Sequence, residues 1–595
     1  MTEVRTQGLT GVERQLLEEV SADRLWSHAE TLAQWEKISG TPGERSAVGY
    51  LRSQLEEFGL DVEEHEFESL LGWPEEAEVQ LRSPEAGRLD AITHSFVPSS
   101  PPGGLEAEVV PVGEGEFASR DVRGRIAIID GIASPGRVLN AGRAGAAGVI
   151  FVNHDQDRIH EMCVSPVWGT PTTETAPLLP KIPVVSMREA DGERLKTLAA
   201  QGPTTVHLRT KTFWDWRPVP VLTGEIQAPS GSRDFVLFSG HHCSWYVGAM
   251  DNGTANATML EVARILSQHR DRLRRNVRIA FWPGHTQGRY SGSTWYFDTF
   301  WEDLHDHCVL HVNADSTGAR GATLYRALGM PGTREFALAA VRDATGVEAE
   351  PERQSRAGDQ SFWSCGVPSI FMDLSEVPAE LSARTGSSGL FTAAGQPPPK
   401  QEGGLPWWWH TAEDTIDKID REVLQRDTRV FLLATLRAAT SPLVRLQFEP
   451  SAREIREAIE RYQGAAGDRI DLGPAARRAA GGESAARELD GLLEEVRGRD
   501  VEQERAERVN RVLLGVDRPL VMMSFTSAFP FDQDLALPVP PVPLLAPAER
   551  LAKLDPSSSE TRFLTTELVR RRNKVTYQLR LAGEAAEEAI ALLRS

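Results

Sequence analysis

Four histidine and aspartate residues stand where a sheet-based metal site would place its ligands. In SGHHCSWYVGAMDNGTANA, His241 ends an apolar segment and Asp251 precedes a predicted helix. Asp315 follows the apolar segment CVLHVN, and His410 lies in WWWHTAEDTIDKID, where it is predicted to open a helix. Imidazoles and carboxylates that converge at one sheet edge suit zinc or another first-row divalent metal. One or two ions per chain are expected, since a carboxylate such as Asp251 can bridge two metals that activate water.

Neighbouring residues extend this candidate site. His285 and Thr286 follow the apolar run NVRIAFWP. An imidazole titrates near neutral pH, so His285 can serve as the general base, but it could equally serve as a ligand. Cys243 as a thiolate and His242 as a spare imidazole are possible additional ligands or supporting groups. The sequence leaves these alternatives open.

Four other residues are weaker candidates for substrate binding. Arg289 and Arg320 lie in the same loops and can clamp a carboxylate, although a solvated surface arginine is commoner. Trp409 ends a run of three tryptophans and either lines an aromatic pocket or simply buries apolar area. Asp359, in the segment GDQ, belongs either to a structural turn or to a loop near the site.

The elements that must position these residues indicate an α/β fold. DFVLFSG, NVRIAFWP, CVLHVNAD and PSIFMDL read as strands with apolar residues on both faces, which is typical of a parallel or mixed sheet covered by helices. In such sheets, functional residues lie at the carboxyl ends of the strands. Near the N-terminus, Val48, Leu51 and Leu55 share one face of a predicted helix. Asp414 and Asp417 are predicted to stabilise a helix N-terminus.

Changes in the residue pattern along the sequence divide the 595 residues into three parts. Residues 1–104 and 211–440 carry the strand–loop–helix pattern and the candidate ligands. Residues 105–210, with short strands and glycine-rich turns, form a compact inserted module. Residues 441–595 are charged amphipathic helices. Such helices need a burial partner, so we predict a homodimer with two-fold symmetry.

Bulk properties limit the partners and the compartment. The net charge of −20 argues against nucleic-acid and anionic-membrane partners. No run is apolar and long enough for a signal peptide or a membrane span. The four cysteines show no paired spacing, which fits a reducing compartment. We therefore predict a cytoplasmic protein that acts on a small molecule or a peptide.

Taken together, these motifs resemble the zinc aminopeptidase, glutamate carboxypeptidase and transferrin receptor family of metallopeptidases. GHHCSWYVGAMD is similar to the glutamate carboxypeptidase branch, and NADS and HTAEDTIDKID resemble further family motifs. The resemblance implies a phosphorylase/hydrolase-like zinc peptidase domain with a mixed central sheet, an inserted protease-associated (PA) domain and a C-terminal helical dimerisation domain. It also implies that His241 and Asp315 bind one metal, that His410 binds a second, and that Asp251 bridges them.

The chain departs from the family at two places. Where the family has two adjacent glutamates, the general base and a ligand of the second metal, this chain has His285 and Thr286. The acidic residue expected two places after the first histidine is Cys243. A threonine hydroxyl is a poor zinc ligand, so the second metal site is weakened or lost.

Three functions remain open on this pattern. The first, which we favour, is a metal-dependent hydrolase of amide or peptide bonds: an aminopeptidase, a carboxypeptidase or a small-molecule amidohydrolase. The second keeps the metal but carries out a lyase reaction or hydrolyses a non-peptide substrate. The third is a non-catalytic binding protein similar to the transferrin receptor.

Overall fold

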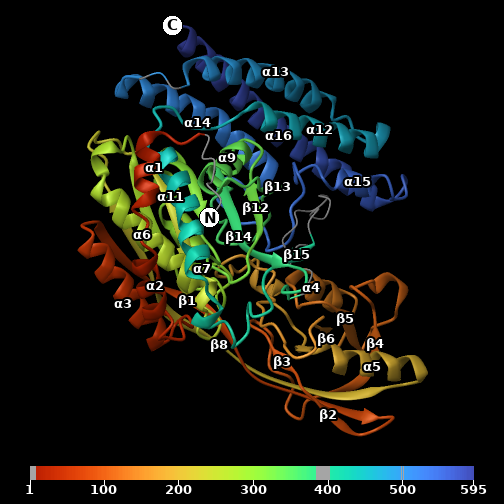
Figure 1. Cartoon of the computed structure of the whole chain (residues 1–595). Coiled ribbons are helices and arrows are strands. Elements are labelled where there is room, and N and C mark those ends of the chain that lie inside the picture. The colour runs from red at the N-terminus through yellow and green to blue at the C-terminus, as the bar shows by residue number, and fades with distance from the viewer. Residues whose placement is uncertain (1–7, 384–401, 498, 500) are drawn as a thin grey trace.

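A mixed sheet forms the centre of the molecule, for which a computed structural model describes residues 8–383, 402–497, 499 and 501–595 (Figure 1). Four parallel strands lie in the order β14–β11–β9–β10. β12 pairs antiparallel with β14, and β13 pairs parallel with β12. The predicted α/β fold is confirmed, with these bounds: β9 (Phe235–His241), β10 (Asn276–Trp282), β11 (Cys308–Asn313), β12 (Leu324–Gly329), β13 (Glu350–Arg353) and β14 (Ser369–Pro378).

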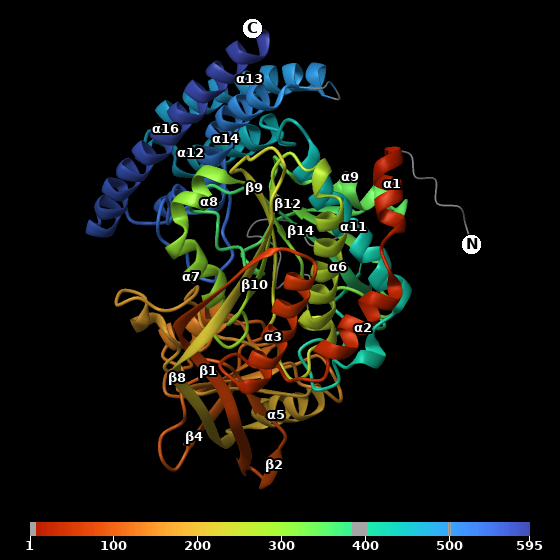
Figure 2. The same cartoon turned by 90° about the vertical axis from the view of Figure 1, so that its left-hand side faces the viewer.

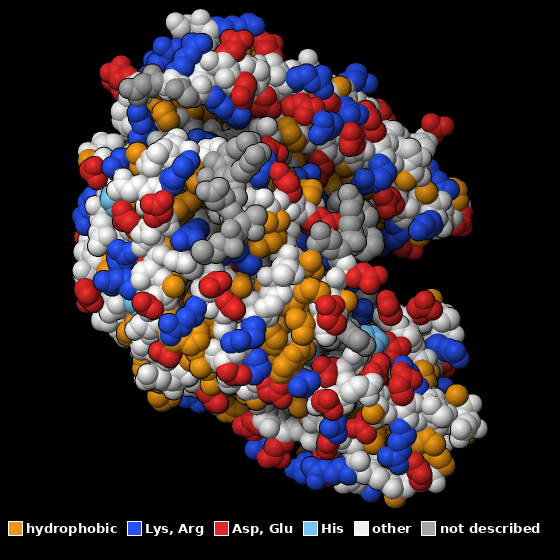
Figure 3. All heavy atoms as spheres, viewed as in Figure 1, with side chains coloured by type: hydrophobic (Ala, Val, Ile, Leu, Met, Phe, Trp, Pro, Cys, Tyr) orange, Lys and Arg blue, Asp and Glu red, His pale blue; other side chains and the backbone are white. Residues whose placement is uncertain are grey.

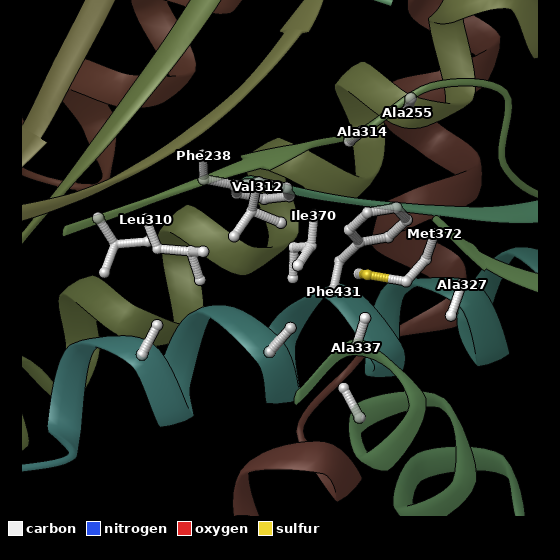
Figure 4. Close-up of a cluster of buried hydrophobic side chains, with 14 of the residues drawn as sticks. Phe238, Ala255, Leu310, Val312, Ala314, Ala327, Ala337, Ile370, Met372 and Phe431 are labelled. Carbon is white, nitrogen blue, oxygen red and sulfur yellow. The ribbon is translucent and has the colours of Figure 1, made fainter. Parts of the chain in front are cut away.

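Helices cover both faces of this sheet (Figure 2). The cause lies in the strands, whose alternate residues enter different apolar clusters: Val236 and Phe238 pack toward one helical layer, Phe235 and Leu237 toward the other. Figure 4 shows Phe238, Val312 and Ile370 on the sheet facing Phe431 of the first layer. That layer contains α2 (Ala22–Leu32), α6 (Ala255–Gln268), α9 (Arg334–Thr345) and α11 (Arg421–Thr440), and the second contains α7 (Ser291–Thr299) and α8 (Trp301–His307).

The N-terminal helices pack against the first layer. In α3 (Pro42–Glu57) the predicted apolar face is buried, with Val48, Leu51 and Leu55 at most 2% exposed. α1 (Gly11–Glu18) begins with a capping box made by Thr10 and Glu13. Residues 1–7 and 384–401, which the domain prediction includes, lie outside the described residues.

In the inserted module β4, β5, β6 and β7 pair in parallel and β3 pairs antiparallel with β7, and two long antiparallel strands connect this part to the central sheet. β1 and β8 pair along nearly their whole length, and β8 also pairs with β10 and with β4. The proposed limits of 105 and 210 remain predictions, and β8 runs through residue 210 without a break. The connecting strands are β1 (Asp61–Ser83) and β8 (Thr205–Ile226), and β2 (Gly87–Leu89) and β3 (Ile92–Thr93) precede residue 105. The module contains β4 (Leu105–Pro111), β5 (Ile126–Asp130), α4 (Pro135–Arg143), β6 (Gly148–Val152), β7 (Val184–Met187) and α5 (Glu189–Gln201).

The C-terminal region is helical, as predicted. Its elements are α12 (Glu449–Ala466), α13 (Gly473–Val496), α14 (Gln503–Phe525), α15 (Ala548–Leu551) and α16 (Ser559–Arg594). Figure 3 shows a notch between this region and the inserted module. Within the described residues, no helix is long and apolar enough to cross a membrane. Dimerisation through these helices remains a prediction.

Candidate metal centre

Parallel strands bring three of the predicted site residues to one edge of the central sheet. His241 is the last residue of β9, and it pairs with Trp282, the last residue of β10. His285 follows β10, and Asp315 follows β11. The expectation that the motif loops leave the carboxyl ends of strands is therefore confirmed.

Asp251 lies between two histidines. His241 Nε2 is 3.1 Å from Asp251 Oδ1 and 3.5 Å from Asp315 Oδ1. His410 Nε2 is 3.0 Å from the other oxygen, Asp251 Oδ2. The four residues predicted as ligands thus meet, and Asp251 offers one oxygen to each side, as a bridging carboxylate must.

The backbone around Asp251 is irregular and is held by Asp414. A π-helical turn spans Ala249–Thr254, and Asp251 departs from helical geometry with φ −111° and ψ 86°. The amides of Met250 and Asp251 donate to the buried Asp414 carboxylate at 2.9 and 3.0 Å. Asp414 therefore binds the first amides of the helical turn that leads into α6 and does not cap a helix of its own segment, which corrects the sequence interpretation in that respect.

His410 also differs from its prediction, because it does not open a helix. It lies in a turn with φ 57°, and the next α-helix, α11, begins at Arg421 behind an Asp420 cap. Trp409 stacks on the His410 ring, with centroids 3.6 Å apart. A ligand in this conformation needs contacts from outside the turn to hold it.

Backbone carbonyls orient both histidines. His241 Nδ1 lies 2.8 Å from the Cys243 carbonyl, and His410 Nδ1 lies 2.7 Å from the Glu161 carbonyl. A carbonyl only accepts, so each Nδ1 donates, and in the neutral ring each Nε2 keeps its lone pair. Metal-binding histidines carry this kind of outer hydrogen bond, which fixes the tautomer and the ring orientation.

The electrostatics favour a cation at this point. Burial opposes a charged His241, but Asp315 and Asp251 outweigh it and raise its pKa well above the ordinary value. Burial likewise raises the pKa of Asp251, yet His241 and His410 overcome this and hold it well below the ordinary value. His241 Nε2 and Asp251 Oδ1 are buried and make no hydrogen bond within the described residues. A donor set of imidazole nitrogens and carboxylate oxygens left in this condition fits a zinc-type divalent ion.

His285 stands beside this cluster and is held by Asp359. Its Nδ1 is 2.8 Å from Asp359 Oδ2, and its ring is nearly parallel to that of His241, with centroids 3.7 Å apart and planes at 18°. Burial raises the pKa of Asp359, but the adjacent His285, together with His241 and Ser293, lowers it below the ordinary value. Asp359 is thus a partner of His285 at the site, not a direct substrate contact.

Ligand atoms of His241, His285 and Asp315 all lie within 4.8 Å of one another, a spacing that by itself would admit an ion. Ring orientation argues against His285 as a second ligand of the same ion. A metal binds imidazole in the ring plane at about 2.1 Å from nitrogen. Two nearly parallel rings 3.7 Å apart direct their lone pairs side by side, so the lone pairs do not meet at one such point.

A cavity of about 660 Å³ opens over the site. It contains the side chains of Asp251, Asp315, His285 and His410, and it is walled by three parts of the chain. The insert contributes Arg137, His154, Met162 and Cys163, and the C-terminal region contributes Ala536, Leu537 and Pro538. The part built around the central sheet contributes Arg289, Tyr290, Arg326, Arg356, Glu376 and Trp409.

Of the residues predicted more weakly to bind substrate, some line the cavity and others do not. Arg289 and Trp409 line the cavity. Arg320 does not; its guanidinium donates to the Asp417 and Ile419 carbonyls at 3.1 Å each, so the structure corrects its assignment.

The additional ligand candidates also take different positions. His242 Nε2 lies 3.1 Å from Glu44 in α3, with both side chains buried, so His242 points away from the site. The Cys243 thiol accepts from the His285 amide at 3.2 Å and from the Thr286 hydroxyl at 3.6 Å. The Cys243 carbonyl lies 2.8 Å from His241 Nδ1, and the thiol lies 4.0 Å from the same nitrogen. Thr286 lines the cavity but touches none of the four ligands by a hydrogen bond within the described residues.

Sequence reasoning missed two groups that position the site. Glu161 reaches His410 from the insert through its backbone. Lys37 is fully buried, its ammonium donates to the Leu32, Trp35 and Val247 carbonyls, and burial lowers its pKa to about 8. No local motif marks either residue, since the contacts of Glu161 with His410 and of Lys37 with Val247 join distant segments of the chain.

Comparisons with known proteins agree with this architecture. Residues 222–435 match the family model of Peptidase family M28, and residues 98–195 match the PA domain. The chain is 24% identical over 344 residues to a probable glutamate carboxypeptidase of Zea mays, covering 47% of this chain and 48% of that protein. This match spans about half of the maize relative.

Other relatives cover more of the chain. Aminopeptidase YwaD of Bacillus subtilis is 26% identical over 448 residues, covering 71% of this chain and 87% of that protein. Among solved structures, the aminopeptidase from Aneurinibacillus sp. strain AM-1 superposes with a TM-score of 0.53 at 21% identity, covering 72% of this chain and 96% of that one. At that identity the structural likeness establishes the fold alone.

Proposed function

We propose that this chain, which matches the models of Peptidase family M28 and of the PA domain, is a metal-dependent hydrolase of amide or peptide bonds. The observation that carries the proposal is the meeting of His241, Asp251, Asp315 and His410 beneath a cavity large enough for a small substrate. Relatives named as aminopeptidases and carboxypeptidases support both peptide classes.

The residues present can hold a divalent ion, which we expect to be zinc. His241 Nε2, Asp315 and Asp251 would hold it, with His410 on the far side of Asp251. When bound, such an ion supplies Lewis-acid polarisation of a carbonyl and a lower pKa for water.

His285 is the proposed proton acceptor. Because its Nδ1 donates to Asp359, its Nε2 is the nitrogen free to take a proton. The stacking against His241 places that ring beside the ligand cluster without making it a ligand. His285→Ala should therefore lower turnover by about 10²- to 10⁴-fold, the usual contribution of a general base, while metal content is unchanged.

Arg289 is the proposed anchor for an acidic group of the substrate. Its Nε is buried and makes no hydrogen bond within the described residues, and its guanidinium lies 4.8 Å from the Tyr290 ring at the cavity wall. The Arg289 carbonyl accepts from the Gly169 amide at 2.6 Å, which fixes the loop. Arg289→Met should raise KM for carboxylate-bearing substrates, whereas Arg320→Met, outside the cavity, should not.

The decisive experiment combines elemental analysis with a substrate panel. The purified chain should contain zinc or a similar ion and hydrolyse N- or C-terminal amide bonds, and His241→Ala should lose both properties. Turnover confined to non-peptide substrates would favour the second function considered from the sequence. A chain without metal and without turnover would favour the third.

A further inference from the structure

Two consecutive residues of the insert hold the turn that carries His410. His160 Nδ1 donates to the Trp409 carbonyl at 2.6 Å. The Glu161 amide donates to the His410 carbonyl at 3.0 Å, and His410 Nδ1 donates to the Glu161 carbonyl at 2.7 Å. Three hydrogen bonds therefore join segments that are 249 positions apart in the chain.

His160 is itself fixed by the core of the insert. Its amide donates to Asn153 Oδ1 at 2.9 Å, and Asn153 directly follows β6. Asn153 is bound in turn, since its amide donates to the Met187 carbonyl at 2.9 Å and its Nδ2 donates to the Gly131 carbonyl at 3.2 Å. His160 is fully buried, and its bonds to Asn153 and to the Trp409 carbonyl connect the core of the insert to the turn.

Bonds within the turn also shape it, since the Trp409 amide donates to the Pro406 carbonyl at 3.0 Å and the Thr411 amide donates to the Trp408 carbonyl at 3.1 Å. His410 occupies the left-handed region at φ 57°, which a histidine rarely adopts. Its Nε2 faces Asp251 Oδ2 at 3.0 Å while its Nδ1 donates to the Glu161 carbonyl. By contrast, His241 is held within its own loop by the Cys243 carbonyl.

We propose that His160 is a positioning residue of the metal site, and that the insert, through His160 and Glu161, completes the coordination environment of His410. This inference rests on the proposed function, because it requires an ion next to His410. It predicts that the inserted domain contributes to metal affinity as well as to the cavity wall.

The test is a Zn²⁺ titration of the full chain after chelator treatment, in competition with a chromophoric chelator. His410→Ala identifies the binding step that depends on His410. His160→Leu should weaken that same step by up to about 10-fold, the lower end of the effect of losing an outer partner of a ligand, because His160 acts on His410 through the neighbouring Trp409 carbonyl. His160→Asn keeps an N–H donor near the position of Nδ1 and should restore most of the affinity. With Co²⁺ in place of Zn²⁺, the visible absorption of the bound ion should differ from wild type in His160→Leu but not in His160→Asn.

A matched control separates this effect from the cost of any buried histidine. His28 in α2 is 5% exposed and pairs with the Tyr50 hydroxyl at 2.7 Å, away from the insert. His28→Leu should leave Zn²⁺ affinity unchanged. If His160→Leu does not fold, Asn153→Ala removes the acceptor of the His160 amide and should give a smaller loss in the same step.

The outcomes are distinct. Wild-type affinity in folded His160→Leu or in Asn153→Ala, or an equal loss in His28→Leu, would overturn the positioning role while leaving the proposed function intact. A wild-type chain that binds no Zn²⁺ would overturn the proposed function, and this inference with it.

Discussion

The His241 side and the His410 side of the site are held by different means. His241 ends a central strand, its side chain is 1% exposed, and its Nδ1 bonds to a carbonyl two residues away. His410 lies in a turn with left-handed backbone, its side chain is 12% exposed, and its Nδ1 bonds to a carbonyl of the insert. One side is therefore built by the sheet, and the other by contact between domains.

This difference indicates which side should tolerate change. A ligand at the end of a buried parallel strand is placed by the same packing that forms the core. A ligand in an irregular turn depends more on individual hydrogen bonds from outside the turn, so the loss of one should displace it more than a ligand at a strand end. We expect the ion beside His241 and Asp315 to be the tighter one.

The largest effect should come from His241→Ala. It removes a ligand from the side that the sheet defines, and it leaves Asp251 and Asp315 close together without the imidazole between them. Bound zinc and hydrolysis should both fall to background in elemental analysis and an amide-hydrolysis assay. Retained zinc in this variant would remove the distinction between the two sides.

His410→Ala should have a smaller effect. Because His241, Asp315 and Asp251 Oδ1 remain together, the variant should keep the ion on the His241 side and lose only the weaker ion binding on the His410 side. Turnover should fall by about 10²- to 10³-fold, as for the loss of one electrostatic contact to the reacting group. Complete loss of zinc would show that the His410 side holds the tighter ion.

The same difference explains what could be predicted from the sequence. His241 and Asp315 could be placed because apolar runs mark the strands and strand ends meet at one edge. His242 could not face the site together with His241, since neighbouring residues at a strand end point to opposite sides, and His242 instead meets Glu44.

Contacts between segments far apart in the chain could not be predicted from local sequence patterns. The hydrogen bonds of His160 and Glu161 to residues 409 and 410 join segments 249 positions apart. The Asp414 carboxylate binds backbone amides more than 160 positions away, whereas its local context resembled a helix cap. The fold class, which depends on periodicity, was predictable; the support of His410, which depends on how two domains meet, was not.

Asp414→Asn should have an intermediate effect, which falls on stability through the turn that carries Asp251 between the two histidines. The carboxylate accepts from two buried amides, and an asparagine would turn its NH₂ group toward one of them. The resulting unpaired donor should lower the free energy of unfolding by about 1–3 kcal/mol, measured by chemical denaturation. Asp417→Asn is the control, because the Asp417 side chain is 67% exposed.

Cys243→Ser should have the smallest effect. The residue orients His241 through its backbone carbonyl, which the substitution keeps, and a serine hydroxyl can still accept from the His285 amide. Zn²⁺ affinity should therefore stay within about threefold of wild type, well below the 10- to 100-fold cost of losing an outer partner of a ligand. A larger loss would mean that the thiol itself takes part in binding, and the His241 side would then depend on a side chain outside the strand as the His410 side depends on the insert.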